Sequence, residues 1–455
     1  MSILSALSPI DQRPLGGFTV PDAYAIAAAV ATARAAAAVW ADRPVKERAA
    51  RVGRLATLLL DRSDHVVEVV SATTGKVHSE ALLGEIFPLL AGLDFYRRQA
   101  HKILATRGVV TSPMLFPGAR ARIERKPFGV VAVIAPWNFP LQLSLMPMLT
   151  ALIAGNAVIL KPSELALPVG ALIGELLGKL ELPPGLVQVL PGARETAEQL
   201  IDAGPDLVFF TGGVAAGRAV MARAAQHPIP VILELGGKDP MVIFDDAPLE
   251  RAVNAALYGA FGNSGQTCVA VERCYVQRGL YSRFVEQVVA ATGRLQVGGS
   301  AHGDLGVITS ARQIETVEAH YQDAVAKGAK ASGPLRREGQ ALYPVVLWEV
   351  TQDMRVMREE TFGPLLPVMP FDTEADAIRL ANDSELGLNA SVWTLDLSKG
   401  QRVASRLRVG GWSVNDVVKN VGHPGLPFGG VGRSGFGRYH GAEACWRSAS
   451  PLAAW

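Results

Sequence analysis

Between residues 129 and 236, short β-branched runs alternate with segments of helical periodicity, and this alternation constrains the fold more than any other feature. The apolar runs lie at 130–135, 157–160, 186–189, 207–210 and 231–233. Helical segments such as 170–180 and 217–226 lie between them. The pattern predicts βαβ units and a parallel sheet whose two faces are covered by helices. We therefore expect an α/β fold with a doubly wound, Rossmann-like domain of the nucleotide-binding kind.

The sequence before this region predicts helices and one hairpin. The first hundred residues look helical, with an Ala-rich stretch at 23–40 and helical spacing at 45–60. The segment 107–125 is mixed and β-prone, without a helical stripe, and could form a hairpin that stands off the body of the domain.

A second α/β series begins at residues 241–244, after Gly236 and Gly237, and continues to about residue 421. The tail beyond it is rich in Gly and Pro and ends near 444–452 in a segment that could add a strand to another surface. A chain of 455 residues is too long for one compact core, so two or three domains are expected.

Composition argues against several functional classes. The net charge is +2 and the sequence has no Lys/Arg-rich block, so no nucleic-acid partner is expected. Three scattered cysteines do not form a disulfide framework, and neither they nor the eight histidines have metal-ligand spacing. We expect a reduced, cytoplasmic protein without a metal site.

The most apolar stretch, 130–154, is long enough to span a membrane. It contains Pro136, Pro140 and Pro147, with Asn138 and Gln142 between them. A lipid-spanning helix accommodates such residues poorly, since each leaves polar backbone or side-chain groups unsatisfied. The stretch instead predicts a buried strand, a tight turn and a core helix, and no membrane anchor is expected.

Cys268 is a candidate nucleophile because it follows the small, turn-forming residues Asn263, Ser264 and Gly265. Such a turn presents a sulfur at a loop or helix start, where backbone N–H groups would stabilise a thiolate and an oxyanion. A lone cysteine is more often a small buried hydrophobe, so its context decides between the two.

Glu234 and Asn138 supply that context. Glu234 interrupts an apolar strand, and a carboxyl group buried there would have a raised pKa suited to a general base; the alternative is an exposed strand end. Asn138 lies in a turn bracketed by prolines and would be a preorganised oxyanion donor; the alternative is a turn residue that satisfies its own backbone.

Two segments suggest a dinucleotide site. Lys161 and Glu164 follow a predicted strand, where they could bond ribose hydroxyls. Gly212 and Gly213 come before a predicted helix that Gly217 opens, and glycines before a helix N-terminus suit a pyrophosphate, although ordinary loop glycines are as common.

In order along the chain, seven segments resemble the aldehyde dehydrogenase superfamily. They are PWNFP (136–140), KPSE (161–164), FTGG (210–213), LELGGKDP (233–240), NSGQTC (263–268), EETFGP (359–364) and PFGGVGRSG (427–435). The match covers nearly the whole chain, and the separation of 34 residues between Glu234 and Cys268 (268 minus 234) is also typical of that family. Seven ordered motifs are far more specific than any one of them.

The resemblance implies NAD(P)-dependent oxidation of an aldehyde to its acid through a cysteine thiohemiacetal and a thioester. It implies Cys268 as the nucleophile, Glu234 as the base for the deacylating water, and Asn138 with the Cys268 backbone N–H as the oxyanion hole. The cofactor residues it implies are Pro136, Trp137, Lys161, Ser163, Glu164, Thr211, Gly212, Gly213, Gly217, Leu235, Gly236, Glu360 and Phe362. Glu164 would favour NAD by repelling the 2′-phosphate of NADP.

This chain departs from many family members at two positions. Gly213 stands where a Ser or Thr hydroxyl often helps to hold pyrophosphate, and Pro147 stands where a Lys is common. Pro147, Asn415, Asp416 and the segments 426–437 and 439–441 resemble the class 3 and coniferyl-aldehyde dehydrogenase branch. That branch implies aromatic or medium-chain to long-chain aliphatic substrates and acceptance of NADP as well as NAD.

The resemblance also implies three regions and a homodimer or homotetramer. Residues 1–104 and 127–236 would form the NAD-binding domain, 237–435 the catalytic domain, and 105–126 with 436–455 an oligomerisation arm.

Three rival functions remain at this point. A CoA-acylating aldehyde dehydrogenase usually lacks the base that Glu234 would supply. A non-enzymatic protein on the same scaffold would be expected to lose Cys268 or Glu234. A cysteine hydrolase needs a His partner for the thiol, and the sequence shows no obvious candidate.

Overall fold

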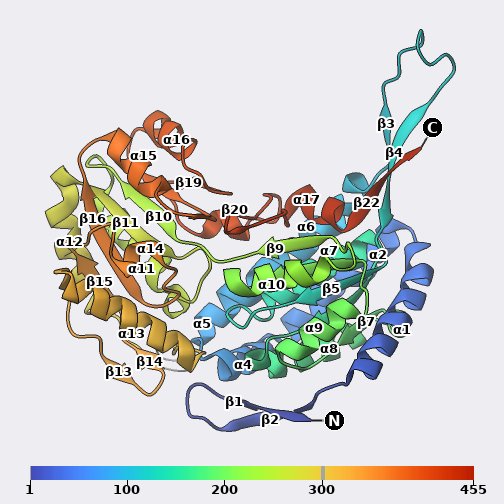
Figure 1. Ribbon diagram of the computed structural model, residues 1–455, viewed down its shortest axis with the longest axis horizontal. Coiled ribbons are helices and arrows are strands. Elements are labelled where there is room, and N and C mark those ends of the chain that lie inside the picture. The colour runs from blue at the N-terminus through green and yellow to red at the C-terminus, as the bar shows by residue number, and fades with distance from the viewer. Residues whose placement is uncertain (1, 299–302, 455) are drawn as a thin grey trace.

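The computed structural model describes residues 2–298 and 303–454, and its first sheet is the one predicted from the alternating runs (Figure 1). Its order is β21-β9-β8-β5-β6-β7. The strands are β5 (Val130–Ile134), β6 (Ala157–Lys161), β7 (Val187–Val189), β8 (Leu207–Thr211), β9 (Val231–Glu234) and β21 (Gly435–Phe436). Strands β5 to β9 are parallel to one another, and β21 is antiparallel to β9. The chain moves outward from β5 to β7 and returns beside β5 as β8, so the order reverses between β5 and β8.

Helices cover this sheet and explain the apolar stretch near β5. All five residues of β5 are buried, as is every residue of α7 (Gln142–Ala154), which contains Pro147. The predicted buried strand, turn and core helix are therefore confirmed. The other helices packed around this sheet include α8 (Leu167–Gly178), α9 (Arg194–Asp202), α10 (Val214–Ala224) and α17 (Gly441–Arg447).

Within the described part of the chain, one helix is long and apolar enough to cross a membrane by length and composition alone, α1 (Ala23–Ala41). Its buried side chains, among them Ile26, Val30 and Trp40, belong to the core of the first sheet. Trp40 Nε1 also donates a hydrogen bond to the Leu152 carbonyl of α7 over 2.7 Å. The apolar composition of α1 therefore matches its packing inside the protein.

The N-terminal region is only partly helical, contrary to the prediction. It begins with an antiparallel hairpin of β1 (Ile3–Leu7) and β2 (Pro14–Thr19), where glycines and a proline disfavour helix. The helical stretch 45–60 is divided at Arg54 into α2 (Val45–Gly53) and α3 (Leu55–Asp61). The elements that follow are α4 (Ser63–Thr74), α5 (His78–Ala81), the π-helical turn η1 (Leu82–Ile86) and α6 (Phe87–Ile103).

The second α/β series forms a second sheet of order β12-β15-β16-β11-β10-β18-β19. Its strands are β10 (Asp239–Ile243), β11 (Val271–Gln277), β12 (Lys330–Ala331), β15 (Val345–Trp348), β16 (Leu365–Phe371), β18 (Ser391–Trp393) and β19 (Ser413–Val414). Met241 and Ile243 pack into one core with α11 (Leu249–Phe261) and α12 (Arg278–Thr292). Val242 lies in another core with α13 (Ala311–Ala326), α14 (Arg355–Arg358), α15 (Glu374–Asn382) and α16 (Leu397–Ala404). Both faces of this sheet are therefore buried.

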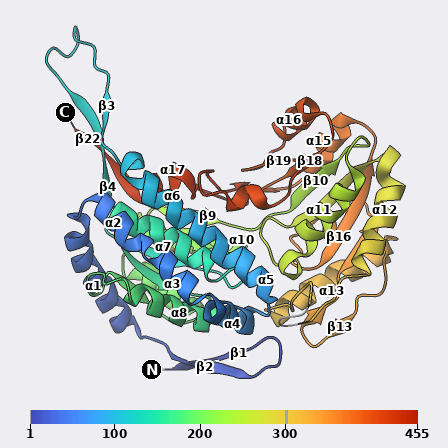
Figure 2. The same cartoon turned by 180° about the vertical axis from the view of Figure 1, so that it is seen from behind.

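The predicted hairpin projects from the body of the molecule (Figures 1 and 2). It consists of β3 (Arg107–Val109) and β4 (Ala121–Pro127), and β22 (Ala449–Ala454) pairs with β4 to complete a three-stranded antiparallel sheet. Both the hairpin and the added C-terminal strand are confirmed.

Two connections join the sheets and enclose the site between them. β9 runs directly into β10 through residues 235–238, and after β19 the chain returns over the first sheet. The returning segment contains η4 (Lys419–Gly422), β20 (Val431–Gly432) and β21. Small elements complete the chain: η2 (Glu164–Ala166), η3 (Gly262–Gly265), β13 (Arg337–Glu338), β14 (Ala341–Leu342) and β17 (Leu386–Gly387).

Candidate active site

A cavity of about 300 Å³ lies at the carboxyl ends of β5, β8 and β9, where these strands face loops of the second sheet. Its wall is formed by Pro136, Trp137, Asn138, Leu143, Thr211, Gly212, Gly213, Glu234, Leu235, Gly236, Cys268, Gln313, Thr316, Glu360, Phe362, Leu388, Phe428 and Tyr439. Of the predicted site residues, only Lys161, Ser163, Glu164 and Gly217 do not line it. The cavity adjoins the point where the strand order reverses, which is where ligands bind in sheets of this kind.

Cys268 is the cysteine that reaches the cavity. It is partly exposed, whereas Cys274 and Cys445 are buried. The turn before it is rigid, because Asn263 and Ser264 have φ of 53° and 54°, a conformation that costs free energy unless the surroundings hold it. Glu80 accepts a hydrogen bond from the Asn263 N–H over 2.6 Å, and Ser264 Oγ donates to a backbone carbonyl over 2.9 Å.

The surroundings of Cys268 favour the thiol over the thiolate. Burial raises its pKa, and the nearby carboxyl groups of Asp239, Glu360 and Glu234 raise it further. Its own backbone N–H lowers the pKa, but this is the weakest of the causes. The expectation that backbone N–H groups stabilise a thiolate here stays a prediction: the Cys268 N–H acts in that direction, while burial and the acidic neighbours act against it. The sulfur needs a base before it can attack.

Glu234 provides an unpaired carboxyl group in the same cavity. Glu234 lies at the end of β9 and is only 3% exposed, so the alternative of an exposed strand end is wrong. Neither carboxyl oxygen has a hydrogen-bond partner among the described residues. Burial raises the pKa of Glu234 well above its usual range, and the positive charge of Arg438 opposes that shift. A buried carboxyl without a partner is costly, which is typical of a group kept for catalysis.

Asn138 is held by the cysteine turn rather than by its own backbone. Its Nδ2 donates to the Gln266 carbonyl over 3.1 Å, and Asn263 Nδ2 donates to the Asn138 carbonyl over 3.2 Å. An amide nitrogen has two hydrogens, so one remains for a ligand in the cavity. The turn with the prolines and the turn with the cysteine are thus bonded to each other.

Glu360 lies against the glycine connection between the two sheets. Its Oε1 accepts a hydrogen bond from the Gly237 N–H over 3.1 Å. A Cβ at Gly236 would lie 2.2 Å from its Oε2, so only glycine allows this approach. Burial, with the nearby Glu272, raises the pKa of Glu360 to about 8.

A buried ion pair that the sequence analysis missed holds the loop of Glu360 and Phe362. Glu272 accepts hydrogen bonds from the Thr361 and Phe362 N–H groups, each over 2.8 Å, and pairs with Lys238 over 2.6 Å. The ring of Phe362 then meets Trp137 edge to face, with centroids 5.5 Å apart. Glu272 follows three apolar residues, Val269, Ala270 and Val271, at the start of β11, and this change from apolar to acidic was the available signal.

The remaining predicted cofactor residues lie beside the cavity, around β6 and α10. Lys161, at the end of β6, is buried, and its Nζ lies 3.7 Å from the exposed carboxylate of Glu164. Ser163 accepts a hydrogen bond from the Leu165 N–H at the start of η2. A Cβ at Gly217 would lie 2.4 Å from Leu235, so this glycine allows α10 to pack closely on β9.

The start of α10 is open. Gly213 is its N-cap, and no side chain caps the helix there. A Cβ at Gly213 would meet nothing within 4 Å. The first N–H groups of α10 are therefore available to an anion.

Tyr439 was not among the predicted site residues, although its segment was part of the resemblance. It is buried beside Phe209 and Phe428, with ring centroids 5.4 Å away in each case. Burial raises the pKa of Tyr439 well above its usual range, and the acidic groups of Glu234 and Cys268 raise it further. Its hydroxyl group thus stays protonated beside them. No histidine occurs in the cavity wall as it is described, so the cysteine-hydrolase alternative lacks the histidine partner that it needs.

A cysteine, an unpaired carboxyl group and an amide thus share one cavity, beside the point where the strand order reverses. Comparisons with known proteins show which family has this arrangement. A sequence model of the aldehyde dehydrogenase family matches residues 2–449. The chain belongs to the aldehyde dehydrogenase family. It is accordingly an oxidoreductase, and the predicted family and fold class are confirmed.

Two curated relatives belong to the same family. The chain is 59% identical over 452 residues to 4,4'-diapolycopene aldehyde oxidase of Methylomonas sp, an alignment that covers 99% of this chain and 85% of that protein. It is 39% identical over 441 residues to a Mycolicibacterium smegmatis protein whose name proposes NADP(+)-dependent succinate-semialdehyde dehydrogenase activity, covering 95% and 84%.

Solved structures give the same result. An aldehyde dehydrogenase from Brucella melitensis biovar abortus superimposes with a TM-score of 0.95 at 32% identity, covering 100% of this chain and 93% of the other. A Mycobacterium tuberculosis aldehyde dehydrogenase complexed with NAD+ superimposes with a TM-score of 0.93 at 32% identity, covering 99% and 94%.

Proposed function

We propose that this aldehyde dehydrogenase oxidises a long, apolar aldehyde to its carboxylic acid, with NAD or NADP as hydride acceptor and Cys268 as the nucleophile. One observation carries the proposal: Cys268 is the cysteine that reaches the cavity, and it shares that cavity with the unpaired carboxyl group of Glu234.

In the acylation half, the sulfur of Cys268 forms a bond to the aldehyde carbon, and the carbonyl electrons move to oxygen. Asn138 Nδ2 and the Cys268 N–H stabilise this oxyanion. The thiol proton passes to the ionised form of Glu234, which its raised pKa makes a stronger proton acceptor than an ordinary carboxylate. Loss of hydride from the same carbon leaves a thioester on Cys268.

Before deacylation Glu234 releases the thiol proton to solvent, and in the deacylation half it takes a proton from water. The hydroxide oxygen bonds to the thioester carbon, the carbon–sulfur bond breaks and the acid leaves. A CoA-acylating enzyme would not need Glu234 in this place.

The residues fit a dinucleotide. The open N-terminus of α10 and the buried, unpartnered Thr211 hydroxyl supply donors for its phosphates. Lys161 and Glu164 would hold the adenosine ribose, and Glu360 and Phe362 the nicotinamide end. When bound, the cofactor accepts the hydride at its nicotinamide ring.

The cavity walls favour an apolar substrate. Leu143, Leu388 and Phe428 line the cavity beside Cys268. A second cavity, of about 390 Å³, touches the same two turns through Phe139 and Thr267 and is walled by apolar side chains such as Leu83 and Tyr258. Neither wall, as described, contains a Lys, Arg or His that could pair with a substrate carboxylate. The name of the 59% identical relative, which refers to a diapolycopene aldehyde, is in accord with this class.

The test compares aldehydes and one cysteine variant. We expect aldehyde-dependent reduction of NAD or NADP, with a higher kcat/KM for long-chain alkanals than for succinate semialdehyde. Cys268→Ala should abolish the reduction while cofactor binding and the thermal midpoint persist, and Cys274→Ala is the matched control that keeps activity. Turnover by Cys268→Ala, or a preference for the acidic aldehyde, would overturn the corresponding part of the proposal.

A further inference from the structure

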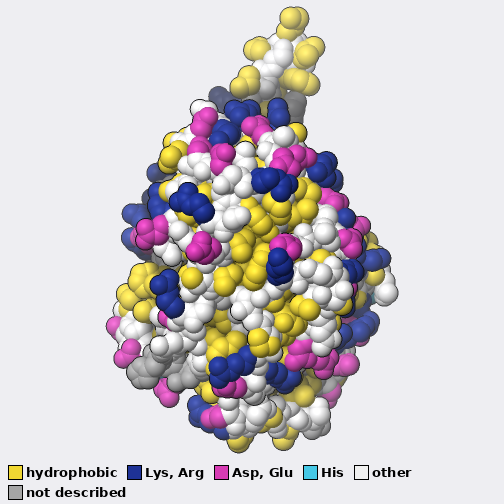
Figure 3. Space-filling model, turned by 90° about the vertical axis from the view of Figure 1, so that its left-hand side faces the viewer, with side chains coloured by type: hydrophobic (Ala, Val, Ile, Leu, Met, Phe, Trp, Pro, Cys, Tyr) yellow, Lys and Arg dark blue, Asp and Glu magenta, His cyan; other side chains and the backbone are white. Residues whose placement is uncertain are grey.

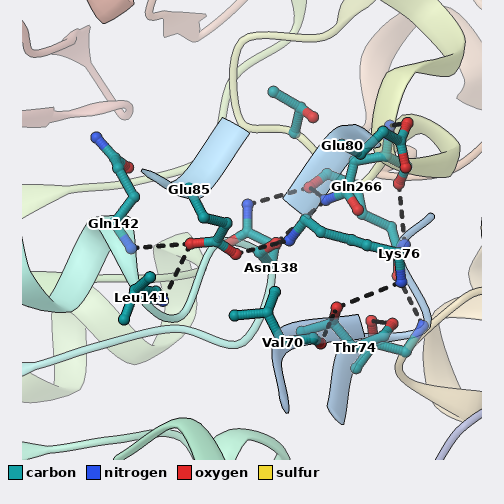
Figure 4. Close-up of polar contacts among 12 residues, drawn as sticks. Val70, Thr74, Lys76, Glu80, Glu85, Asn138, Leu141, Gln142 and Gln266 are labelled. Carbon is teal, nitrogen blue, oxygen red and sulfur yellow. Dashed lines mark hydrogen bonds and ion pairs between the residues drawn. The ribbon is translucent and has the colours of Figure 1, made fainter. Parts of the chain in front are cut away.

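A buried ion pair lies behind the turn that carries Asn138 and has no place in the reaction just described. Lys76 follows α4, and Glu85 lies on the π-helical turn η1; their side chains are 0% exposed and Lys76 Nζ lies 3.0 Å from Glu85 Oε1 (Figure 4). Ionised side chains are rarely buried so completely, because the loss of hydration is costly.

The π-helical turn places Glu85. In this turn the Phe87 N–H bonds to the carbonyl of Leu82, five residues earlier, which inserts one extra residue between α5 and α6. Such turns are rare and are found often at functional sites. Glu85 Oε2 accepts hydrogen bonds from the N–H groups of Leu141 and Gln142, over 3.0 and 2.8 Å. It thereby caps α7, whose own N-cap residue has no side-chain cap, and its negative charge matches the helix dipole.

Lys76 holds the other side of the turn. Its ammonium group donates a hydrogen bond to the Asn138 carbonyl and lies 4.2 Å from the centroid of the Phe139 ring. Together Lys76 and Glu85 fix the backbone at residue 138 and again at 141–142. Figure 4 shows Asn138 between this pair and Gln266.

We propose that Lys76 and Glu85 are positioning residues, which hold the Asn138 turn so that the Asn138 amide meets the oxyanion formed at Cys268. The inference rests on the proposed function, because it concerns the rate of the acylation step. A shift of the turn by a fraction of an ångström would displace Asn138 Nδ2 from the developing charge, and misplacements of about 1 Å can cost roughly a hundredfold in rate.

The experiment is a double-mutant cycle on the burst of reduced cofactor at saturating aldehyde. Lys76→Met combined with Glu85→Gln removes both charges together, so no buried charge is left unpaired, and Gln can still accept from α7. We expect the burst rate to fall by about ten- to a hundredfold in the wild-type background, with cofactor affinity unchanged. Asn138→Ala alone should lower the burst rate by about a hundred- to a thousandfold. In that background the same pair of changes should not lower the burst rate further.

If Lys76 and Glu85 only stabilise the fold, the burst rate should fall by the same factor in the wild-type and Asn138→Ala backgrounds. That result would overturn the inference. An unchanged burst rate in both backgrounds would overturn it as well. Arg34→Met is the matched control, because it breaks the ion pair of Arg34 with Asp206 (2.6 Å) in the same part of the fold, away from the cavity. It should lower the thermal midpoint without changing the burst rate.

If the doubly neutral variant does not fold, Glu85→Asp goes through the same cycle, since it keeps both charges but shortens the reach to α7. The fall in burst rate that Glu85→Asp causes must likewise be absent in the Asn138→Ala background. A wild-type protein without any aldehyde-dependent burst would contradict the proposed function itself, whereas a wild-type burst with additive losses contradicts the positioning role alone.

Discussion

Glu234 has one cation near its buried carboxyl group, and a glycine makes their approach possible. A Cβ at Gly429 would lie 2.8 Å from Glu234 Oε1 and 3.0 Å from Arg438 Nη1, so these two atoms are about 6 Å apart or closer. Arg438 is itself fixed by hydrogen bonds to the carbonyls of Gly430 and Gly437, over 2.9 and 2.6 Å. Arg438 is therefore a fixed positive charge that lowers the pKa of the Glu234 carboxyl group.

Replacement of Arg438 by Met should shift the pH dependence of deacylation. Glu234 acts as a base only when deprotonated, and burial already raises its pKa, so kcat rises as pH passes upward through that pKa. Removing the cation raises the pKa of Glu234 further, so the rise moves to higher pH in a profile of kcat against pH. Arg438→Lys keeps the charge and should stay close to the wild-type profile. Identical profiles of kcat against pH for Arg438→Met and the wild type would show that Arg438 does not affect the pKa of Glu234.

At the level of residues, motifs predicted the groups that do chemistry but not the groups that support them. Cys268, Glu234 and Asn138 were singled out from their sequence surroundings, and the structure brings them to one cavity. Lys76 and Glu85 went unnoticed because a charged residue in a polar helical segment usually faces solvent. Their burial depends on contacts with residues 138–142, which local sequence does not show.

At the level of elements, the N-terminus of α10 determines how the cofactor phosphates are held. The helix begins after Gly213 with no side-chain cap, where many family members have a hydroxyl. Space around Gly213 is open, and its backbone conformation is one that any residue adopts, with φ of −71°. A hydroxyl group would therefore fit without strain.

Gly213→Ser should tighten cofactor binding severalfold, because the hydroxyl adds a donor beside the helix N–H groups. Stability should change by only a few tenths of a kcal/mol, since Gly and Ser are both accepted at an N-cap. Fluorescence titration with NAD would give the dissociation constant. Gly178→Ser, also in open space but on α8, is the control, and equal constants for Gly213→Ser and wild type would contradict this view of α10.

The five parallel strands of the first sheet were predicted to within about a residue, because β-branched runs buried on both faces give a clear signal. The hairpin β1–β2 and the π-helical turn η1 were not predicted. Pro14–Thr19 contains two glycines and forms a strand only by pairing with Ile3–Leu7, and an extra residue in a helix leaves the apolar periodicity almost unchanged. Both features are decided by tertiary contacts.

At the level of the whole molecule, the projecting hairpin has an apolar tip (Figure 3). Val110, Met114 and Leu115 are 99%, 88% and 71% exposed. Exposed apolar clusters of this kind mark interaction surfaces. We propose that residues 105–126 and 436–455 form an oligomerisation arm, beside an NAD(P)-binding domain of 1–104 and 127–236 and a catalytic domain of 237–435.

Replacing Val110, Met114 and Leu115 together by Ser should shift the protein from a homodimer or homotetramer towards a smaller species. The reason is that the apolar area buried between copies would be lost. Light scattering after size-exclusion chromatography gives the mass, and Leu60→Ser, at an exposed position on α3, is the control. An unchanged mass would mean that the tip does not hold copies together.

The central claim is that Cys268 carries the acyl group and that Glu234 releases it. The most direct measurement is the mass of Glu234→Gln protein after mixing with NAD and a long-chain aldehyde, followed by peptide mapping. We predict a burst of about one reduced cofactor per subunit, slow turnover, and one acyl group as a thioester on the peptide that contains Cys268. Unmodified Cys268 after the burst, or an acyl group on another residue, would contradict the account.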